Sequence, residues 1–167
     1  LVVSDEIHQD IIIGDKKFTP AGIVGKGKYR DNLVTVSAAS KTFNLAGLLH
    51  NHIVISDQKL RERYDQYAKT VNQSEVNVIG VTATQAAYTY GEEWLESVLE
   101  IVRGNYQHLK EEINKNAPGI AVTALEGTYL VLLDLRKYIH PEDTKAFIQD
   151  KCRLAVDFGE WFGANFK

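Results

Sequence analysis

The stretch Ser37-Ala38-Ala39-Ser40-Lys41-Thr42-Phe43-Asn44-Leu45-Ala46-Gly47 decides the fold, and it follows the strand-like run Leu33 to Val36. Aliphatic and β-branched residues in that run predict a buried strand. A lysine placed directly after such a strand, among hydroxyls and small residues, can lose its solvent. Desolvation favours the neutral amine, which a Schiff-base nucleophile requires. The sequence therefore makes Lys41 a candidate nucleophile, and a solvated loop lysine is the alternative.

A second polar motif closes another apolar run. Leu1 to Val3 leads into Ser4-Asp5-Glu6-Ile7-His8, so Asp5 stands at the end of a predicted strand. A carboxylate in such a place requires a cationic partner if it is buried. A protonated ring nitrogen would serve, which makes Asp5 a second candidate site residue.

Strand-like and helix-like segments alternate on both sides of these motifs. A helix capped by Ser56 and a long helix that begins near Glu92 and ends at Pro118 are the clearest. Further strands are predicted at 53–55, 120–123, 129–135 and 154–156, and further helices at 76–90 and 141–151. This order predicts an α/β first part and a small α+β unit in the last third, which the long helix connects.

Composition excludes several classes of protein. Lys+Arg 19 against Asp+Glu 22 gives a net charge of −3, which does not suggest a nucleic-acid partner. The longest apolar stretches, Ile11 to Ile13 and Leu130 to Leu133, are far shorter than the roughly 20 residues that span a membrane. Cys152 is the only cysteine, which excludes an internal disulfide and fits a reducing compartment, with the cytoplasm as the expectation.

Two other motifs have weak support. Gly22 to Lys28 has the glycine spacing of a phosphate-binding loop, but Tyr29 stands where that motif needs Ser or Thr. His50 and His52 form a His-x-His pair without a nearby third ligand. We therefore predict neither a nucleotide site nor a metal site here.

The beginning of the chain is unusual. There is no methionine, and the sequence opens directly on the apolar run Leu1-Val2-Val3. This pattern predicts a piece of a longer protein.

Together the two polar motifs carry a family resemblance. The runs S-D-E-I-H and S-K-T-F-N-L-A-G-L resemble the fold-type I pyridoxal-phosphate enzymes, in particular the MalY/PatB group of cystathionine β-lyases. The resemblance continues through Glu126 to Leu130, Leu133 to Arg136 and Val156 to Gly163. It covers the whole chain but corresponds to only the second half of such an enzyme.

That resemblance implies a fold and an assembly. Residues 1–91 would be the C-terminal part of an aspartate aminotransferase-like large domain that binds pyridoxal phosphate. Residues 92–167 would be the bridging helix and an incomplete small α+β domain. Homodimers with active sites at the subunit interface are also implied.

The resemblance also implies roles for four residues. Lys41 would form the Schiff base with pyridoxal phosphate, and Asp5 would keep the pyridine nitrogen protonated, which makes the ring an electron sink. His8 would lie near the phenolic oxygen of the cofactor, and Ser40 would contact its phosphate.

Some positions depart from the wider superfamily. Ala38 replaces a common serine, and Leu49 stands where many aminotransferases have a phosphate-binding arginine. The missing arginine is typical of the lyase group. Neither Arg136 nor Arg153 lies in the motif of the substrate-carboxylate arginine, so that role would fall beyond Lys167.

The resemblance implies α,β-elimination of cystathionine or a similar cysteine S-conjugate to a thiol, pyruvate and ammonia. Lys41 would remove the Cα proton and return a proton to the leaving sulfur. An aminotransferase with the same lysine and aspartate is the first alternative. The second is a catalytically incomplete domain that serves dimerisation or another contact, and we expect the chain to be inactive alone.

Overall fold

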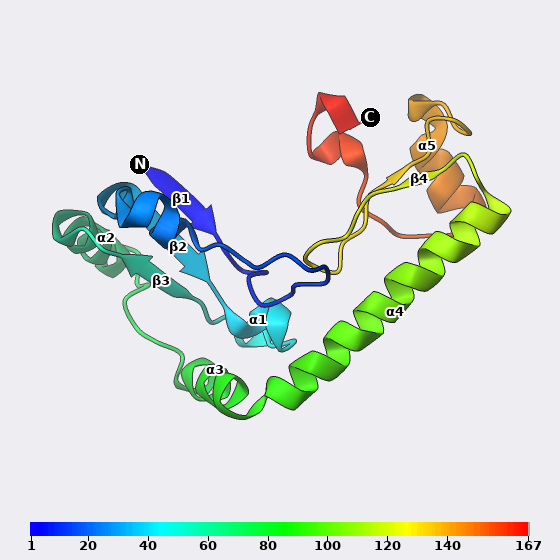
Figure 1. Cartoon of the computed structure of the whole chain (residues 1–167). Coiled ribbons are helices and arrows are strands. Elements are labelled where there is room, and N and C mark those ends of the chain that lie inside the picture. The colour runs from blue at the N-terminus through cyan, green and yellow to red at the C-terminus, as the bar shows by residue number, and fades with distance from the viewer. Residues whose placement is uncertain (167) are drawn as a thin grey trace. The chain divides into compact units, whose positions relative to one another are not determined.

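Strand β2, Leu33–Ser37, is the middle strand of a three-stranded sheet in the computed structural model, which describes residues 1–166. It pairs in parallel with β1, Val2–Asp5, and antiparallel with β3, His52–Ile55 (Figure 1). The register places Asp5 opposite Val36. Parallel pairing brings the carboxyl ends of β1 and β2 to the same edge of the sheet, so the two polar motifs of the sequence leave the sheet side by side.

The other elements follow in chain order. The helices are α1 Ala39–Thr42, α2 Gln58–Thr70, α3 Val78–Tyr90, α4 Glu92–Asn116 and α5 Pro141–Ala146. A second, two-stranded sheet pairs β4, Ala121–Val122, with β5, Leu133–Asp134. Short 3-10 or π segments occupy Ala21–Gly27, Arg30–Asn32, Ala46–Leu48, Phe147–Lys151, Gly159–Trp161 and Ala164–Phe166, and the first of them contains a kink.

The chain divides into two compact units by its internal contacts. The first unit contains residues 1–103 and 125–129, and the second contains residues 104–124 with the described residues from 130 onward. The division falls inside α4. The predicted domain boundary between residues 91 and 92 stays a prediction.

Side-chain caps explain where two helices of the first unit begin. The Asp57 carboxylate accepts a hydrogen bond from the Leu60 N–H at 2.7 Å and starts α2, so the predicted cap, Ser56, is one residue too early. Asn77 caps α3 by accepting from the N–H groups of Ile79 and Gly80. Both helix starts follow from the short polar side chain that precedes each helix.

Three predicted segments differ from the structure. Strand 129–135 is reduced to β5, and 154–156 contains no strand. The physical reason is that β4 offers β5 only two paired residues, while Leu154 and Val156 are 54% and 48% exposed and have no β-ladder in residues 1–166. The helix predicted over 141–151 is α5 followed by a π turn.

The core of the first unit draws on segments far apart in the sequence. The sheet contributes Leu33 and Ile55, α4 contributes Leu99, and the returning segment 125–129 contributes Leu125. Ile11 and Ile13, in the loop after β1, are also buried. Ile12, between the last two, forms an isolated antiparallel bridge with Gly127. The loop after β1 is thereby fastened to the segment 125–129.

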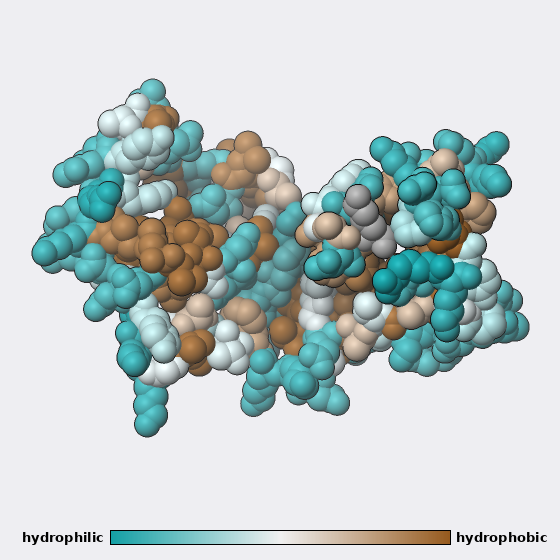
Figure 2. Space-filling view, turned by 90° about the horizontal axis from the view of Figure 1, so that it is seen from above, coloured by the Kyte–Doolittle hydropathy of each residue, from teal (hydrophilic) through white to brown (hydrophobic). Residues whose placement is uncertain are grey.

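Apolar side chains also remain on the surface of the first unit. Val2, Val3 and Val54 on the strands are each more than half exposed, and α3 exposes Val78 and Ile79 to a similar or greater degree. Figure 2 shows hydrophobic residues gathered on one face of this unit. Extended apolar surface of this kind is typical of contact with further protein. Within residues 1–166, no helix combines the length and apolar character needed to cross a membrane.

Gly91, at the junction between α3 and α4, is closely packed against its neighbours. A Cβ on Gly91 would lie 2.5 Å from the Ala87 carbonyl oxygen and 2.6 Å from a ring carbon of Phe43. We expect Gly91→Ala to lower the free energy of unfolding by about 1–3 kcal/mol, because neither neighbour can move freely. Urea denaturation followed by circular dichroism measures this change. Gly104→Ala is the matched control, since its Cβ would meet nothing within 4 Å, and an equal loss in both variants would contradict the packing argument.

Candidate active site

Lys41 occupies the third position of α1, the single helical turn that follows β2. Ala38 is still extended, and the turn then closes through the Phe43 N–H, which donates to the Ala39 carbonyl at 2.9 Å, and the Leu45 N–H, which donates to the Ser40 carbonyl at 3.0 Å. The chain therefore changes from strand to helix within one residue. This abrupt change presents Lys41 just beyond the carboxyl edge of the sheet.

A pocket of about 340 Å³ opens beside Lys41. Ser40, Lys41 and Asn44 supply polar groups to its lining, and Tyr129 adds an aromatic ring. The apolar part of the lining comes mainly from α4: Trp94, Leu95, Val98, Leu99 and Val102. A few polar groups on an otherwise apolar lining is the usual composition of a small-molecule site.

Lys41 differs from the sequence-based expectation in one respect. Its side chain is exposed, whereas the residues of α1 that turn inward are Ala39 and Thr42, at 1% and 2% exposure. A helical turn of four residues has one inward face, and those two side chains occupy it. The prediction of a desolvated lysine is therefore not met by this chain by itself.

The two carboxylates that follow β1 have different surroundings. Glu6 is buried, and its Oε1 accepts hydrogen bonds from Ser4 Oγ at 3.1 Å and the Ala21 N–H at 2.8 Å. Asp5 is exposed, and its Oδ1 accepts from the Ile7 N–H at 3.1 Å. Glu6 therefore holds the local fold, whereas Asp5 keeps an accessible carboxylate at the edge of the sheet.

His8 is fixed by the segment that returns at 125–129. Its Nδ1 lies 3.2 Å from Thr128 Oγ1, at hydrogen-bond distance, and its ring meets the Tyr129 ring edge-on at a centroid distance of 5.5 Å. Thr128 has a positive φ of 60°, which is uncommon for a β-branched residue. Through Tyr129, His8 is in contact with a residue of the pocket lining.

The charges of Lys41 and Asp5 both act on His8. Burial and then the nearby Lys41 ammonium lower the pKa of His8 below its ordinary 6.5, and the Asp5 carboxylate opposes this by raising it. Lys41 and Asp5 therefore both lie within electrostatic range of His8. Ser40 and Lys41 line the pocket, but Asp5 and His8 are not part of its lining.

The titration of His8 tests this arrangement. We expect its NMR midpoint below 6.5, a rise in Lys41→Ala because a positive charge is removed, and a further fall in Asp5→Asn because a negative charge is removed. Because the folded-state pKa is lowered, His8 reduces folding stability as the pH falls below 6.5, when only the unfolded chain gains the proton. The ring resonances of His8 report the midpoint directly. A His8 midpoint unmoved by both substitutions would contradict the proximity of the three groups.

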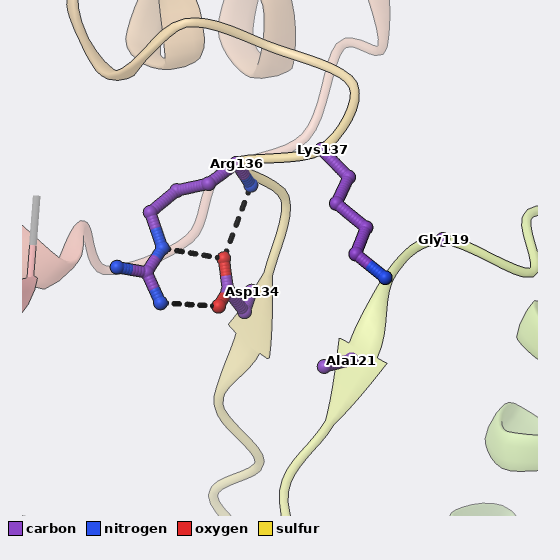
Figure 3. A pocket seen from close by; sticks show the side chains of 5 residues that line it. All are labelled: Gly119, Ala121, Asp134, Arg136 and Lys137. Atoms are coloured by element: carbon purple, nitrogen blue, oxygen red, sulfur yellow. Dashed lines mark hydrogen bonds and ion pairs between the residues drawn. The ribbon is translucent and has the colours of Figure 1, made fainter.

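A second pocket of about 330 Å³ lies in the second unit (Figure 3). The Arg136 guanidinium donates to both carboxylate oxygens of Asp134, and these hydrogen bonds lower the pKa of Asp134 to about 2. In Figure 3 the Lys137 side chain extends toward the strand that carries Ala121. The pocket contains none of the predicted site residues, and its guanidinium is already paired, so we place the candidate site at Lys41.

Several residues near Lys41 were missed by sequence reasoning. Asp10, Thr42 and Tyr88 form a hydrogen-bonded group, and Thr128 and Tyr129 hold His8. The run Glu126 to Leu130 was the one signal in the sequence. Because part of it was interpreted as a strand, the contact with His8 was not predicted. No local pattern joins Asp10 to Tyr88, since 78 positions separate them.

Comparison with known families decides the classification. Residues 1–163 match the family described as aminotransferase class I and II. The chain belongs to this family. The match covers the sheet, the Lys41 turn, α4 and nearly all of the second unit, which confirms the resemblance that the sequence motifs indicated.

Two curated relatives are similar to most of this chain. Cystathionine beta-lyase PatB of Bacillus subtilis is 32% identical over 137 residues, and the alignment covers 82% of this chain and 35% of PatB. Protein MalY of Escherichia coli is 29% identical over 165 residues, which cover 97% of this chain and 41% of MalY. The chain therefore spans well under half the length of these relatives.

Solved structures agree with the family. Cystalysin from Treponema denticola, described as containing a pyridoxal 5'-phosphate cofactor, superimposes with a TM-score of 0.93 at 28% identity, over 99% of this chain and 42% of that protein. The PLP-bound C-S lyase from Staphylococcus hominis gives a TM-score of 0.78 at 32% identity, over 88% of this chain and 37% of that protein. The predicted aminotransferase-like fold is confirmed at this level.

Proposed function

We propose that this chain carries the lysine-bearing part of a pyridoxal-phosphate-dependent C–S β-lyase that acts on cystathionine or a similar cysteine S-conjugate. The observation that carries the proposal is the pocket beside Lys41, with Ser40 in its lining and His8 and Asp5 within electrostatic reach. The lyase names of PatB and the Staphylococcus hominis enzyme support the reaction class. The shares of 35% and 37% mean that further sequence contributes to those enzymes.

The groups around Lys41 fit pyridoxal phosphate. The pocket lining offers the accessible Lys41 amine for an aldehyde and the Ser40 hydroxyl for a phosphate. The accessible Asp5 carboxylate, outside that lining, suits a protonated ring nitrogen. Lys41 would bind the cofactor covalently, Asp5 would face its ring nitrogen and Ser40 its phosphate, while His8 would lie near its ring oxygen. When bound, pyridoxal phosphate supplies an electron sink for negative charge that develops at the substrate Cα.

The chain's own residues would move and hold the protons of the reaction. The Lys41 amine would remove the Cα proton and deliver a proton to the departing sulfur. The Asp5 carboxylate would hold a proton on the ring nitrogen by charge-assisted hydrogen bonding. His8, whose pKa is lowered, stays neutral at pH 7 and adds no positive charge beside Lys41. Overall one thioether and one water give a thiol, pyruvate and ammonia.

One assay tests the reaction class. The full-length natural protein is incubated with pyridoxal phosphate and cystathionine but no keto acid, and pyruvate is measured. Pyruvate release with one thiol per pyruvate is the expected result. Turnover that begins only after a keto acid is added would contradict the lyase proposal and support an aminotransferase, the activity that the family description favours.

We also propose that two copies of the protein associate in the cytoplasm. Exposed apolar residues on β1 and α3 support an association surface, and the single exposed Cys152 supports a reducing compartment. The same surface supports the second alternative from the sequence, a domain that only makes contacts. Analytical ultracentrifugation distinguishes these cases when combined with the pyruvate assay: a dimer without any turnover would favour the contact role.

A further inference from the structure

One hydrogen-bonded cluster next to Lys41 has no part in the mechanism above. Asp10 Oδ2 accepts a hydrogen bond from Thr42 Oγ1 at 2.9 Å and another from the Tyr88 hydroxyl at 2.8 Å. Thr42 is only 2% exposed, so its hydroxyl group is enclosed by protein. A single carboxylate oxygen thus joins three segments of the chain.

Two of the three segments carry candidate site residues, and the third is α3. Asp10 stands two residues after His8, in the loop that leaves β1, and Thr42 follows Lys41 directly. Tyr88 belongs to α3, and its ring is held edge-on by Phe43 at a centroid distance of 5.2 Å. Phe43 also packs at 5.8 Å against Trp94, which lines the pocket.

We propose that Asp10, Thr42 and Tyr88 act as a positioning cluster that fixes the Lys41 turn relative to the loop that carries His8. The inference rests on the proposed function, since it assigns the cluster to the lysine that binds the cofactor. Helix α1 has only four residues, and a single turn cannot hold its own orientation in water. A charged acceptor beneath Thr42 supplies the tertiary anchor that the turn lacks.

Tyr88 remains a donor to this cluster throughout the neutral pH range. Burial, then the hydrogen bond to Asp10 and its charge, raise the pKa of Tyr88 to about 12. The phenol therefore stays protonated when an enzyme of this class works. Asp10, which accepts from two protonated hydroxyls, keeps the same two donors over that range.

Substitution of Thr42 separates the hydroxyl from the packing. Thr42→Val keeps the shape but removes the donor, so we expect the visible absorbance band of lysine-bound pyridoxal phosphate to form about 10- to 100-fold more slowly, as misplaced reacting groups do. The kcat for pyruvate release should fall by a similar factor, with the KM for cystathionine unchanged. Thr42→Ser keeps the donor and should stay within about twofold of the native rate.

A second pair of variants guards against a Thr42→Val protein that fails to fold. Tyr88→Phe removes the other donor and should slow band formation in the same direction. Tyr90→Phe is its matched control, because Tyr90 is on the same helix and is 84% exposed. Native-like band formation in both Thr42→Val and Tyr88→Phe would overturn the proposal.

A readout without cofactor checks the cluster itself. In protein labelled with ¹³Cζ-tyrosine, the Tyr88 resonance should titrate near 12, and Asp10→Asn should lower that midpoint toward about 10. An unchanged midpoint would overturn the cluster. The proposed function has its own test. If the native protein and Lys41→Ala form the same absorbance band, or neither forms one, Lys41 is not the cofactor lysine and the positioning role is also wrong.

Discussion

Replacing Lys41 with alanine is expected to lower pyruvate release from cystathionine by about 10³- to 10⁴-fold, the upper range for loss of a general acid–base group. The reason is that one amine is assigned both the removal of the Cα proton and the protonation of the sulfur. Among residues 1–166, no other lysine lines the pocket beside α1. Steady-state rates at saturating cystathionine and pyridoxal phosphate measure the effect.

Lys59→Ala is the matched control for this substitution. Lys59 is an exposed lysine of α2, and it is absent from the pocket lining. Its replacement should leave the rate of pyruvate release within about twofold, as is usual for an exposed helix position. If Lys41→Ala and Lys59→Ala had equal rates, the assignment of Lys41 would be wrong.

Replacing Asp5 with asparagine is expected to lower the same rate by about 10²- to 10³-fold, the usual loss when one preorganised charge-stabilising group is removed. Asparagine has nearly the same shape but no negative charge, so it cannot hold a proton on a ring nitrogen. The cap on the Ile7 N–H survives because an amide oxygen also accepts a hydrogen bond. Loss of rate would therefore report charge rather than local unfolding.

Asp15→Asn is the control for Asp5→Asn. Asp15 is an exposed aspartate of the same unit, and no hydrogen bond of the site involves the loop position that it occupies. Its variant should keep the native rate. Equal rates for native protein and Asp5→Asn, at saturating cofactor, would remove Asp5 from the proposed mechanism.

The part of the fold nearest Lys41 was predictable because its signals are local. Strand β2 contains mainly aliphatic residues, and a polar motif follows it directly. Helix α4 carries apolar residues at spacings of three and four along its length. Polar residues before α2 and α3 mark their starts, although Asp57 rather than Ser56 makes the α2 cap. Such features depend on near neighbours in sequence, which a pattern records.

The errors arise where structure depends on distant partners. The predicted strand over 129–135 has strand-like residues, but a strand needs a ladder. Within the described residues 1–166, β5 pairs with β4 alone. Instead, Gly127 bridges to Ile12 and Tyr129 packs on His8. Propensity indicates a suitable residue type, whereas pairing across more than a hundred positions is a property of the folded chain.

The candidate site shows the same limit. Lys41, Asp5, His8 and Ser40 could be selected because their motifs are short and resemble a known family. Asp10 contributes to the site through two long-range hydrogen bonds, to Thr42 and Tyr88, that no motif encodes. The exposure of Lys41 was also unpredictable, because burial of a lysine depends on what covers it and not on the residues beside it.

The most direct measurement of the central claim is the position of the covalent bond to the cofactor. The protein is incubated with pyridoxal phosphate, reduced with borohydride, digested and mapped by peptide mass spectrometry. The account predicts a phosphopyridoxyl group on the peptide that contains Lys41, absent from Lys41→Ala. A stoichiometric modification at a different lysine, or an equal spread over exposed lysines, would contradict it.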